Sequence, residues 1–133
     1  MKNVSYGYGR TLTNLGFDRA VEKVTAELKR EGFGVLTEID VKETLKKKLG
    51  VDFKRYKILG ACNPPLAHQA LSAEPEIGLL LPCNVVVAEE DDGQASVATI
   101  SPKEMFRLVD NPDLVDIADQ VEAKMRRVID RLE

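Results

Sequence analysis

The chain of 133 residues contains no tryptophan, only one histidine and only two cysteines. It also lacks any apolar run near the roughly 20 residues that a membrane-spanning helix needs, so we expect no membrane association. Its first residues open directly into a strand pattern, without the apolar core of a secretory signal. Two cysteines without such a signal indicate a reducing, cytoplasmic location, where metal or redox chemistry is more expected than a structural disulfide.

Several motifs of common functional classes are missing as well. The cysteines form no Cys-x-x-Cys pair, and the one histidine has no nucleophile motif beside it, which argues against a Ser/His/Asp type of hydrolase. Gly7 and Gly9 alternate within a strand pattern instead of joining a strand to a helix, so they do not predict a phosphate loop. A net charge of −3 argues against specific binding of nucleic acid, whose partners are usually basic.

What is present predicts one domain over residues 1–133, with 44% hydrophobic and 31% charged residues. Alternating and helical apolar spacings predict strands at 4–12, 33–39, 56–62, 83–88 and 95–100, with helices at 17–31, 41–49, 64–71, from 102 and from 112. Five strands with one hairpin and unequal helices indicate an α+β fold, in which a largely antiparallel sheet is covered on one face. A doubly wound fold is not expected, because buried parallel strands are missing.

Helix-start signals support these boundaries. Asp40 and Ser101 each begin a capping box, and Asn63 followed by Pro64 is a favourable helix start. In the second helix the periodicity predicts a buried stripe of Val41, Leu45 and Leu49. In the last helix it predicts a continuous apolar stripe of Leu114, Ile117, Ala118, Val121, Met125, Val128 and Leu132. In the strand at 33–39, strict alternation places Phe33, Val35, Thr37 and Ile39 on one face.

The two cysteines are the residues with the clearest chemical potential. Cys62 lies in the phrase Gly-Ala-Cys-Asn-Pro-Pro and Cys83 in Leu-Pro-Cys-Asn-Val, each at the end of a strand pattern. A helix start beside Cys62 favours its thiolate, although the two prolines remove N–H groups that would face the sulfur. A helix of roughly 12 Å followed by an extended return of roughly 20 Å over residues 77–82 can bring Cys83 back beside Cys62.

Three interpretations of the cysteines stay open. With Asn63 and Asn84, they can line a site for a small ligand; with His68, Cys62 and Cys83 can bind a metal such as zinc, with water or a partner's residue as the fourth ligand. Alternatively one thiolate serves a thiol-dependent enzyme or redox protein. In the third interpretation both cysteines only pack, in a structural dimer module.

The cysteine phrases within residues 56–67 and 78–87, together with residues 32–40 and the helix end Leu49-Gly50-Val51, resemble the domain of unknown function 302 family. The resemblance covers almost the whole chain. It implies an α+β fold similar to the TATA-box-binding-protein-like class, with a curved antiparallel sheet packed on helices, and it implies homodimers. It implies no activity, and a likeness to a DNA-binding fold transfers no function.

Charges are clustered in two stretches, a basic one at 42–57 and an acidic one at 74–76 and 89–92. One interpretation is that both stretches are solvated, as a basic helix face and an acidic hairpin tip. The alternatives are an anion-binding edge, or complementary patches that join two subunits. The apolar face of the first strand, with Tyr6 and Tyr8, adds to the expectation of a homodimer. The glycines beside these tyrosines are expected to let a helix or a second chain approach closely.

Overall fold

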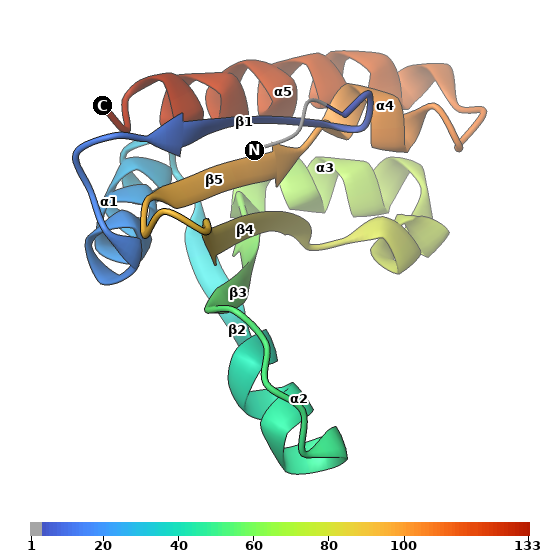
Figure 1. Cartoon of the computed structure of the whole chain (residues 1–133). Helices are drawn as coiled ribbons and strands as arrows, with labels where there is room; N and C mark the ends of the chain where they lie inside the picture. The colour runs from blue at the N-terminus through green and yellow to red at the C-terminus, as the bar shows by residue number, and fades with distance from the viewer. Residues whose placement is uncertain (1–3) are drawn as a thin grey trace.

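The computed structural model describes residues 4–133 and has an α+β architecture around one antiparallel sheet (Figure 1). The five strands lie in the order β1-β5-β4-β3-β2, and every neighbouring pair is antiparallel. The strands are β1 (Gly7–Leu12), β2 (Gly34–Asp40), β3 (Tyr56–Cys62), β4 (Cys83–Glu89) and β5 (Ala95–Ile100). The predicted fold class is confirmed.

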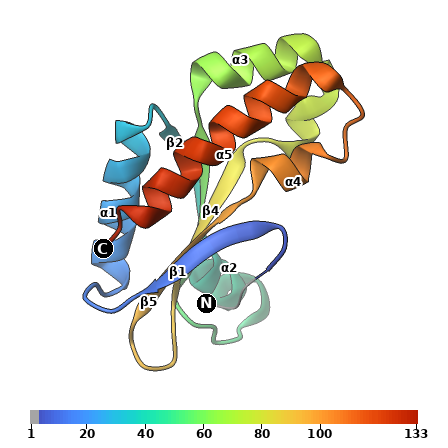
Figure 2. The same cartoon turned by 90° about the horizontal axis from the view of Figure 1, so that it is seen from above.

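Four helices cover one face of this sheet. The helical segments are α1 (Phe17–Arg30), α2 (Val41–Leu49), α3 (Pro64–Ala73), α4 (Pro102–Phe106) and α5 (Val115–Asp130), with short 3-10 turns η1 (Pro75–Leu80) and η2 (Pro112–Leu114). In both views α1, α3, α4 and α5 lie on one side of the sheet (Figures 1 and 2). Figure 1 shows α2 extending away from the sheet on the side opposite α5. No helix among residues 4–133 is long and apolar enough to cross a membrane.

The core lies between α1, α5 and the central strands. Val85, Val87 and Val97 are completely buried on the covered face of the sheet. The predicted apolar stripe of the last helix is buried against them: Leu114, Ile117, Ala118, Val121, Met125, Val128 and Leu132. Helical periodicity therefore identified the helix that closes the core.

The predicted helix starts are also confirmed. The side chains of Asp40, Asn63 and Ser101 each accept a hydrogen bond from the backbone N–H three residues later, at 2.9, 3.4 and 3.4 Å. The second helix ends at Gly50, whose φ of 65° is the left-handed conformation that glycine adopts without strain. In the Ser101 cap, Glu122 of α5 accepts the serine hydroxyl hydrogen bond at 2.7 Å, so the cap also ties α4 to α5.

Residues 75–80 and α2 differ from the predictions. Residues 75–80 form the 3-10 turn η1 and not an extended return, because Ile77 turns inward and is buried in the core. No residue of α2 is fully buried, and Leu49 is 69% exposed. This helix extends from β2 and β3 beyond the sheet, so Val41 and Leu45 are half-buried and no other element within residues 4–133 covers Leu49.

The first strand, β1, begins at Gly7 and is shorter than predicted. Its two tyrosines differ in burial, and Gly9 is needed for strand pairing. Tyr8 lies under the Arg126 guanidinium, 4.4 Å from the ring centre, and its hydroxyl donates to Asp130, so it packs within the subunit, while Tyr6 is 61% exposed. A Cβ on Gly9 would lie 2.6 Å from the Val97 carbonyl oxygen. The glycine therefore permits close pairing with β5 of the same chain.

Candidate functional site

The two cysteines meet at one end of the sheet. The β3–β4 register pairs Ala61 with Cys83, so Cys62 and Cys83 are one residue apart along neighbouring strands. The chain between them leaves as α3 and returns through η1 to Pro82, which follows a cis peptide bond. The prediction that the intervening segment brings the cysteines together is supported, although the return path differs from the expected one.

Both cysteines line a pocket of about 280 Å³ between the sheet end and the helical layer. Its walls come from the turn after α1, the sheet, α3, η1, α4 and α5, and they contain no charged residue. The lining residues are Phe33, Leu36, Ala61, Cys62, Asn63, Leu66, Ala67, Ala70, Leu71, Gly78, Leu81, Pro82, Cys83, Phe106, Ile117 and Val121. The volume is near the small end of ligand sites, about 300–1,000 Å³.

Asn63 is the one side chain of this lining with an amide group, and its nitrogen and its oxygen each already make a hydrogen bond. Its amide nitrogen donates to the Glu31 carbonyl oxygen at 3.2 Å, and its oxygen accepts from the Leu66 backbone. Asn63 therefore fixes the start of α3 against the end of α1. The pocket that results offers an apolar surface and two sulfur atoms.

Asn84 lies elsewhere. Because side chains alternate along β4, Cys83 points into the pocket, and Asn84 is exposed and lines a groove on the opposite face of the sheet. The structure therefore does not bring Asn84 into the pocket with the two cysteines.

The two thiols differ in their surroundings. Cys83 is 5% exposed, and burial, followed by the nearby Cys62 thiol, raises the pKa of Cys83 to about 12. At neutral pH Cys83 is thus a protonated thiol and a poor nucleophile. Cys62 is half-buried at the pocket wall, and both cysteines are free thiols.

The predicted metal ligands Cys62, Cys83 and His68 do not come together in the structure. Within residues 4–133, no group of three or more His, Cys, Asp or Glu side chains is placed to hold a metal ion. His68 is exposed on α3 and does not line the pocket. Zinc bound by Cys62, Cys83 and His68 therefore has no support in the geometry.

Several lining residues were not anticipated as part of a site. Leu36 reaches the pocket because the β2–β3 register shifts between Val35 and Thr37, which makes it the extra residue of a β-bulge. The strict alternation predicted for this strand is therefore wrong. The sequence shows Phe106, Ile117 and Val121 as apolar residues near the C-terminus, but no pattern in it indicates that they line a pocket with the cysteines.

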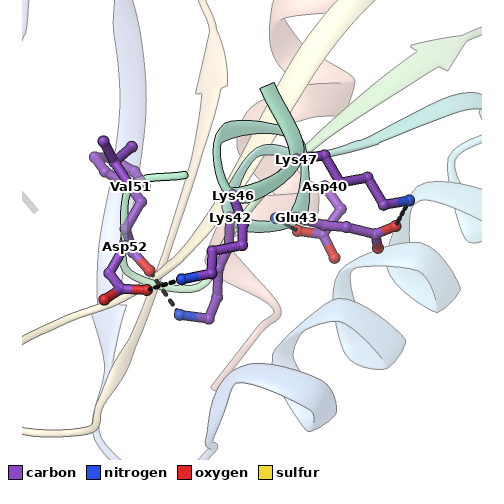
Figure 3. Close-up of a pocket in the computed structure, with 8 residues that line it drawn as sticks. Asp40, Lys42, Glu43, Lys46, Lys47, Val51 and Asp52 are labelled. Carbon is purple, nitrogen blue, oxygen red and sulfur yellow. Dashed lines mark hydrogen bonds and ion pairs between the residues drawn. The ribbon is translucent and has the colours of Figure 1, made fainter. Parts of the chain in front are cut away.

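The basic stretch forms a separate hollow of about 360 Å³ beside α2 (Figure 3). Lys46 pairs with Asp52 at 3.2 Å and Lys47 with Glu43 at 2.6 Å, while Lys42 donates to the Phe53 carbonyl oxygen at 2.9 Å. The contacts of Lys46 and Lys42 hold the loop after α2 against the helix, whereas the Lys47–Glu43 pair lies within α2. Together these contacts occupy three of the lysines that an anion-binding edge would need.

Comparison with known proteins assigns the family. The family model described as "Domain of unknown function DUF302" matches residues 8–132. The chain belongs to this family. A crystal structure of an uncharacterized conserved DUF302 protein from Bacillus stearothermophilus is 31% identical, with a TM-score of 0.89, and the match covers 98% of this chain and 100% of that one.

The comparison with curated proteins finds no match. Membership of the DUF302 family thus establishes the fold and confirms the resemblance carried by the cysteine phrases. It brings no activity with it.

Proposed function

We propose that this DUF302 protein binds a small, uncharged, apolar molecule in the pocket beside Cys62 and Cys83. The observation that carries the proposal is the lining, in which no side chain is charged and the one amide is already hydrogen-bonded. A charged or strongly polar ligand would lose its hydration there without gaining partners. An apolar ligand would gain free energy from every part of its surface that it buries.

The mouth of the pocket supports the same ligand class. Leu36 and Leu71, both in the lining, are 67% and 41% exposed. Leucines at the opening of a pocket extend the apolar surface that a ligand contacts. The half-buried Cys62 thiol adds a polarizable, weakly polar contact.

The alternatives have less support. A thiol-dependent enzyme needs an activated thiolate, yet Cys83 is protonated at neutral pH and the only histidine lies outside the pocket. A zinc site needs three protein ligands, and the described residues do not group them. Binding without catalysis requires neither an activated thiolate nor a metal site. A cytoplasmic location, which we propose as well, would keep both thiols reduced, as they are in the structure.

The test uses N-phenyl-1-naphthylamine, an uncharged apolar dye whose fluorescence rises on leaving water. Ala67 is half-buried in the pocket wall, so Ala67→Trp should fill the space and weaken dye binding at least tenfold. Ala123, exposed on α5, gives the matched control Ala123→Trp, which should bind the dye like the unmodified protein. Equal binding by both variants would contradict the proposal.

A second pair of variants guards against misfolding at Ala67. Leu36→Lys places a charge at the mouth and should weaken dye binding, whereas Leu108→Lys, at a 79% exposed leucine outside the lining, should not. Bound dye should also slow alkylation of Cys62 by iodoacetamide. Dye binding that leaves the alkylation rate unchanged would place the dye elsewhere.

A further inference from the structure

Two phenylalanines line the pocket from different elements. Phe33 lies in the turn between α1 and β2, and Phe106 is the last residue of α4. Both side chains are buried, so close packing around them leaves them little freedom to turn away from the pocket. The lining also contains the sulfur atoms of Cys62 and Cys83, and polarizable sulfur makes favourable contacts with aromatic rings. These four side chains distinguish the pocket from a purely aliphatic cavity.

The size of the pocket limits the size of the ligand. Its volume of about 280 Å³ is nearly twice the roughly 150 Å³ of an engineered apolar cavity that binds benzene. Two fused six-membered rings therefore fit here, where one ring fits the smaller cavity. A sphere of about 280 Å³ is roughly 8 Å across, so rings at its centre lie within the roughly 4.5–7 Å between ring centroids that aromatic pairs prefer.

A rigid aromatic ring system suits this pocket better than an alkyl chain or a saturated ring. An alkyl chain loses rotational freedom when it is bound, whereas fused rings have no internal rotation to lose. Aromatic pairs also gain stability beyond the burial of apolar area, and a saturated ring of the same shape lacks this gain. Within residues 4–133, the lining contains no charged side chain that could pair with a charged substituent, so the ring system has to be neutral.

We propose that the ligand is a neutral fused bicyclic aromatic compound of about the size of naphthalene, whose rings contact Phe33 and Phe106. This inference rests on the proposed function, because it narrows the ligand class of the same pocket. A polar substituent on the rings stays in water at the mouth, where Leu36 and Leu71 are partly exposed.

The test compares 2-naphthol, decahydro-2-naphthol and phenol by isothermal titration calorimetry at pH 7. All three are uncharged at this pH and carry one hydroxyl group, so they differ only in aromaticity or in ring number. If burial of apolar area alone decided affinity, the saturated compound would bind at least as tightly as 2-naphthol. We expect 2-naphthol to bind at least about fivefold more tightly than decahydro-2-naphthol and at least about tenfold more tightly than phenol. A preference below about twofold in either comparison would overturn the proposal.

Variants of the two phenylalanines test the ring contacts. Phe33→Leu and Phe106→Leu each keep an apolar side chain, and each should reduce the preference for 2-naphthol over decahydro-2-naphthol by at least half. Phe17 is a buried phenylalanine outside the lining, so the matched control Phe17→Leu should keep the preference. Circular dichroism checks the folding of each variant, and with two positions one folded variant is sufficient. An unchanged preference in the folded Phe33 and Phe106 variants would overturn the ring contacts.

Failure of this inference and failure of the proposed function give different results. If N-phenyl-1-naphthylamine binds in the pocket but 2-naphthol is not preferred over decahydro-2-naphthol, the pocket is an apolar site without aromatic selectivity. Only the inference of an aromatic ligand then fails. If the dye does not bind in the pocket, as the Ala67→Trp and Leu36→Lys variants would show, both proposals fail.

Discussion

Burial of the Cys83 thiol makes the stability of the protein depend on pH in the alkaline range. The pKa of Cys83 rises from 9.0 to about 12 in the folded chain. Above pH 9 the unfolded chain releases this proton while the folded chain keeps it, so stability falls as pH rises. The contribution is fully present below pH 9 and is lost as pH rises toward 12.

The magnitude follows from the two pKa values. Three pKa units correspond to about 4 kcal/mol over the whole titration, of which about 1.4 kcal/mol is lost between pH 8 and pH 10. Cys83→Ala removes this dependence. We expect the variant to be about 1 kcal/mol less stable than the unmodified protein at pH 8, and to match or exceed its stability at pH 10.

The assay is urea unfolding at pH 8, 9 and 10 with a phosphine reductant, followed by circular dichroism. Cys62→Ala serves as the control, because burial is the larger cause of the Cys83 shift and persists without Cys62. The control should therefore keep most of the alkaline loss. Parallel stability curves for Cys83→Ala and the unmodified protein would refute the argument that the Cys83 thiol is buried and neutral.

Three further predictions concern residues that shape the pocket or the core. Asn63→Ala should lower the free energy of unfolding by about 1–2 kcal/mol, because it removes a helix cap and the donor to the Glu31 carbonyl; a loss below about 0.5 kcal/mol in urea unfolding would contradict this. Gly60→Ala should cost about 1–3 kcal/mol, because the new Cβ would clash with the Thr37 hydroxyl on β2 and would lie 2.7 Å from the Pro82 ring; an unchanged melting temperature would show that these two side chains can move away without cost. For Glu122, burial raises the carboxyl pKa, but hydrogen bonds from a hydroxyl, a backbone N–H and a guanidinium outweigh burial and lower the pKa overall. The ionised Glu122 therefore stabilises the folded chain above the pKa of the unfolded chain, and this stabilisation is lost as pH falls through the lower pKa of the folded chain. Glu122→Gln should be less stable than the unmodified protein by about 1–3 kcal/mol at pH 7, and the difference should shrink as pH falls below about 4; a difference that does not change with pH would contradict this prediction.

Local signals in the sequence determined the element order and most element boundaries. Asp40, Asn63 and Ser101 each begin a helix as their capping chemistry predicts, because a cap involves residues only three positions apart. The stripe from Leu114 to Leu132 predicted the buried face of α5 for the same reason, since its periodicity is local. The cysteine phrases also identified the family, as the match to residues 8–132 confirms.

The candidate site was predictable only in part. Cys62 and Cys83 were expected together because the intervening chain can leave and return. The β3–β4 register places Cys83 opposite Ala61, one residue from Cys62, and both cysteines line the pocket. His68 was expected beside them, yet it lies on the exposed side of α3. Which side of a short helix faces a pocket depends on how that helix packs against its neighbours. A rotation of the helix about its axis by the angle between two successive residues would change which side chains face the pocket.

The tertiary structure alone decided which apolar surfaces are covered. Val41, Leu45 and Leu49 carry the same spacing as a buried helix stripe, but α2 extends beyond the sheet and leaves Leu49 exposed. Leu36 enters the pocket through a β-bulge, and a bulge depends on pairing with a distant strand. Periodicity states which residues can share a face, whereas burial requires a second element opposite that face, and only the folded arrangement determines where that element lies.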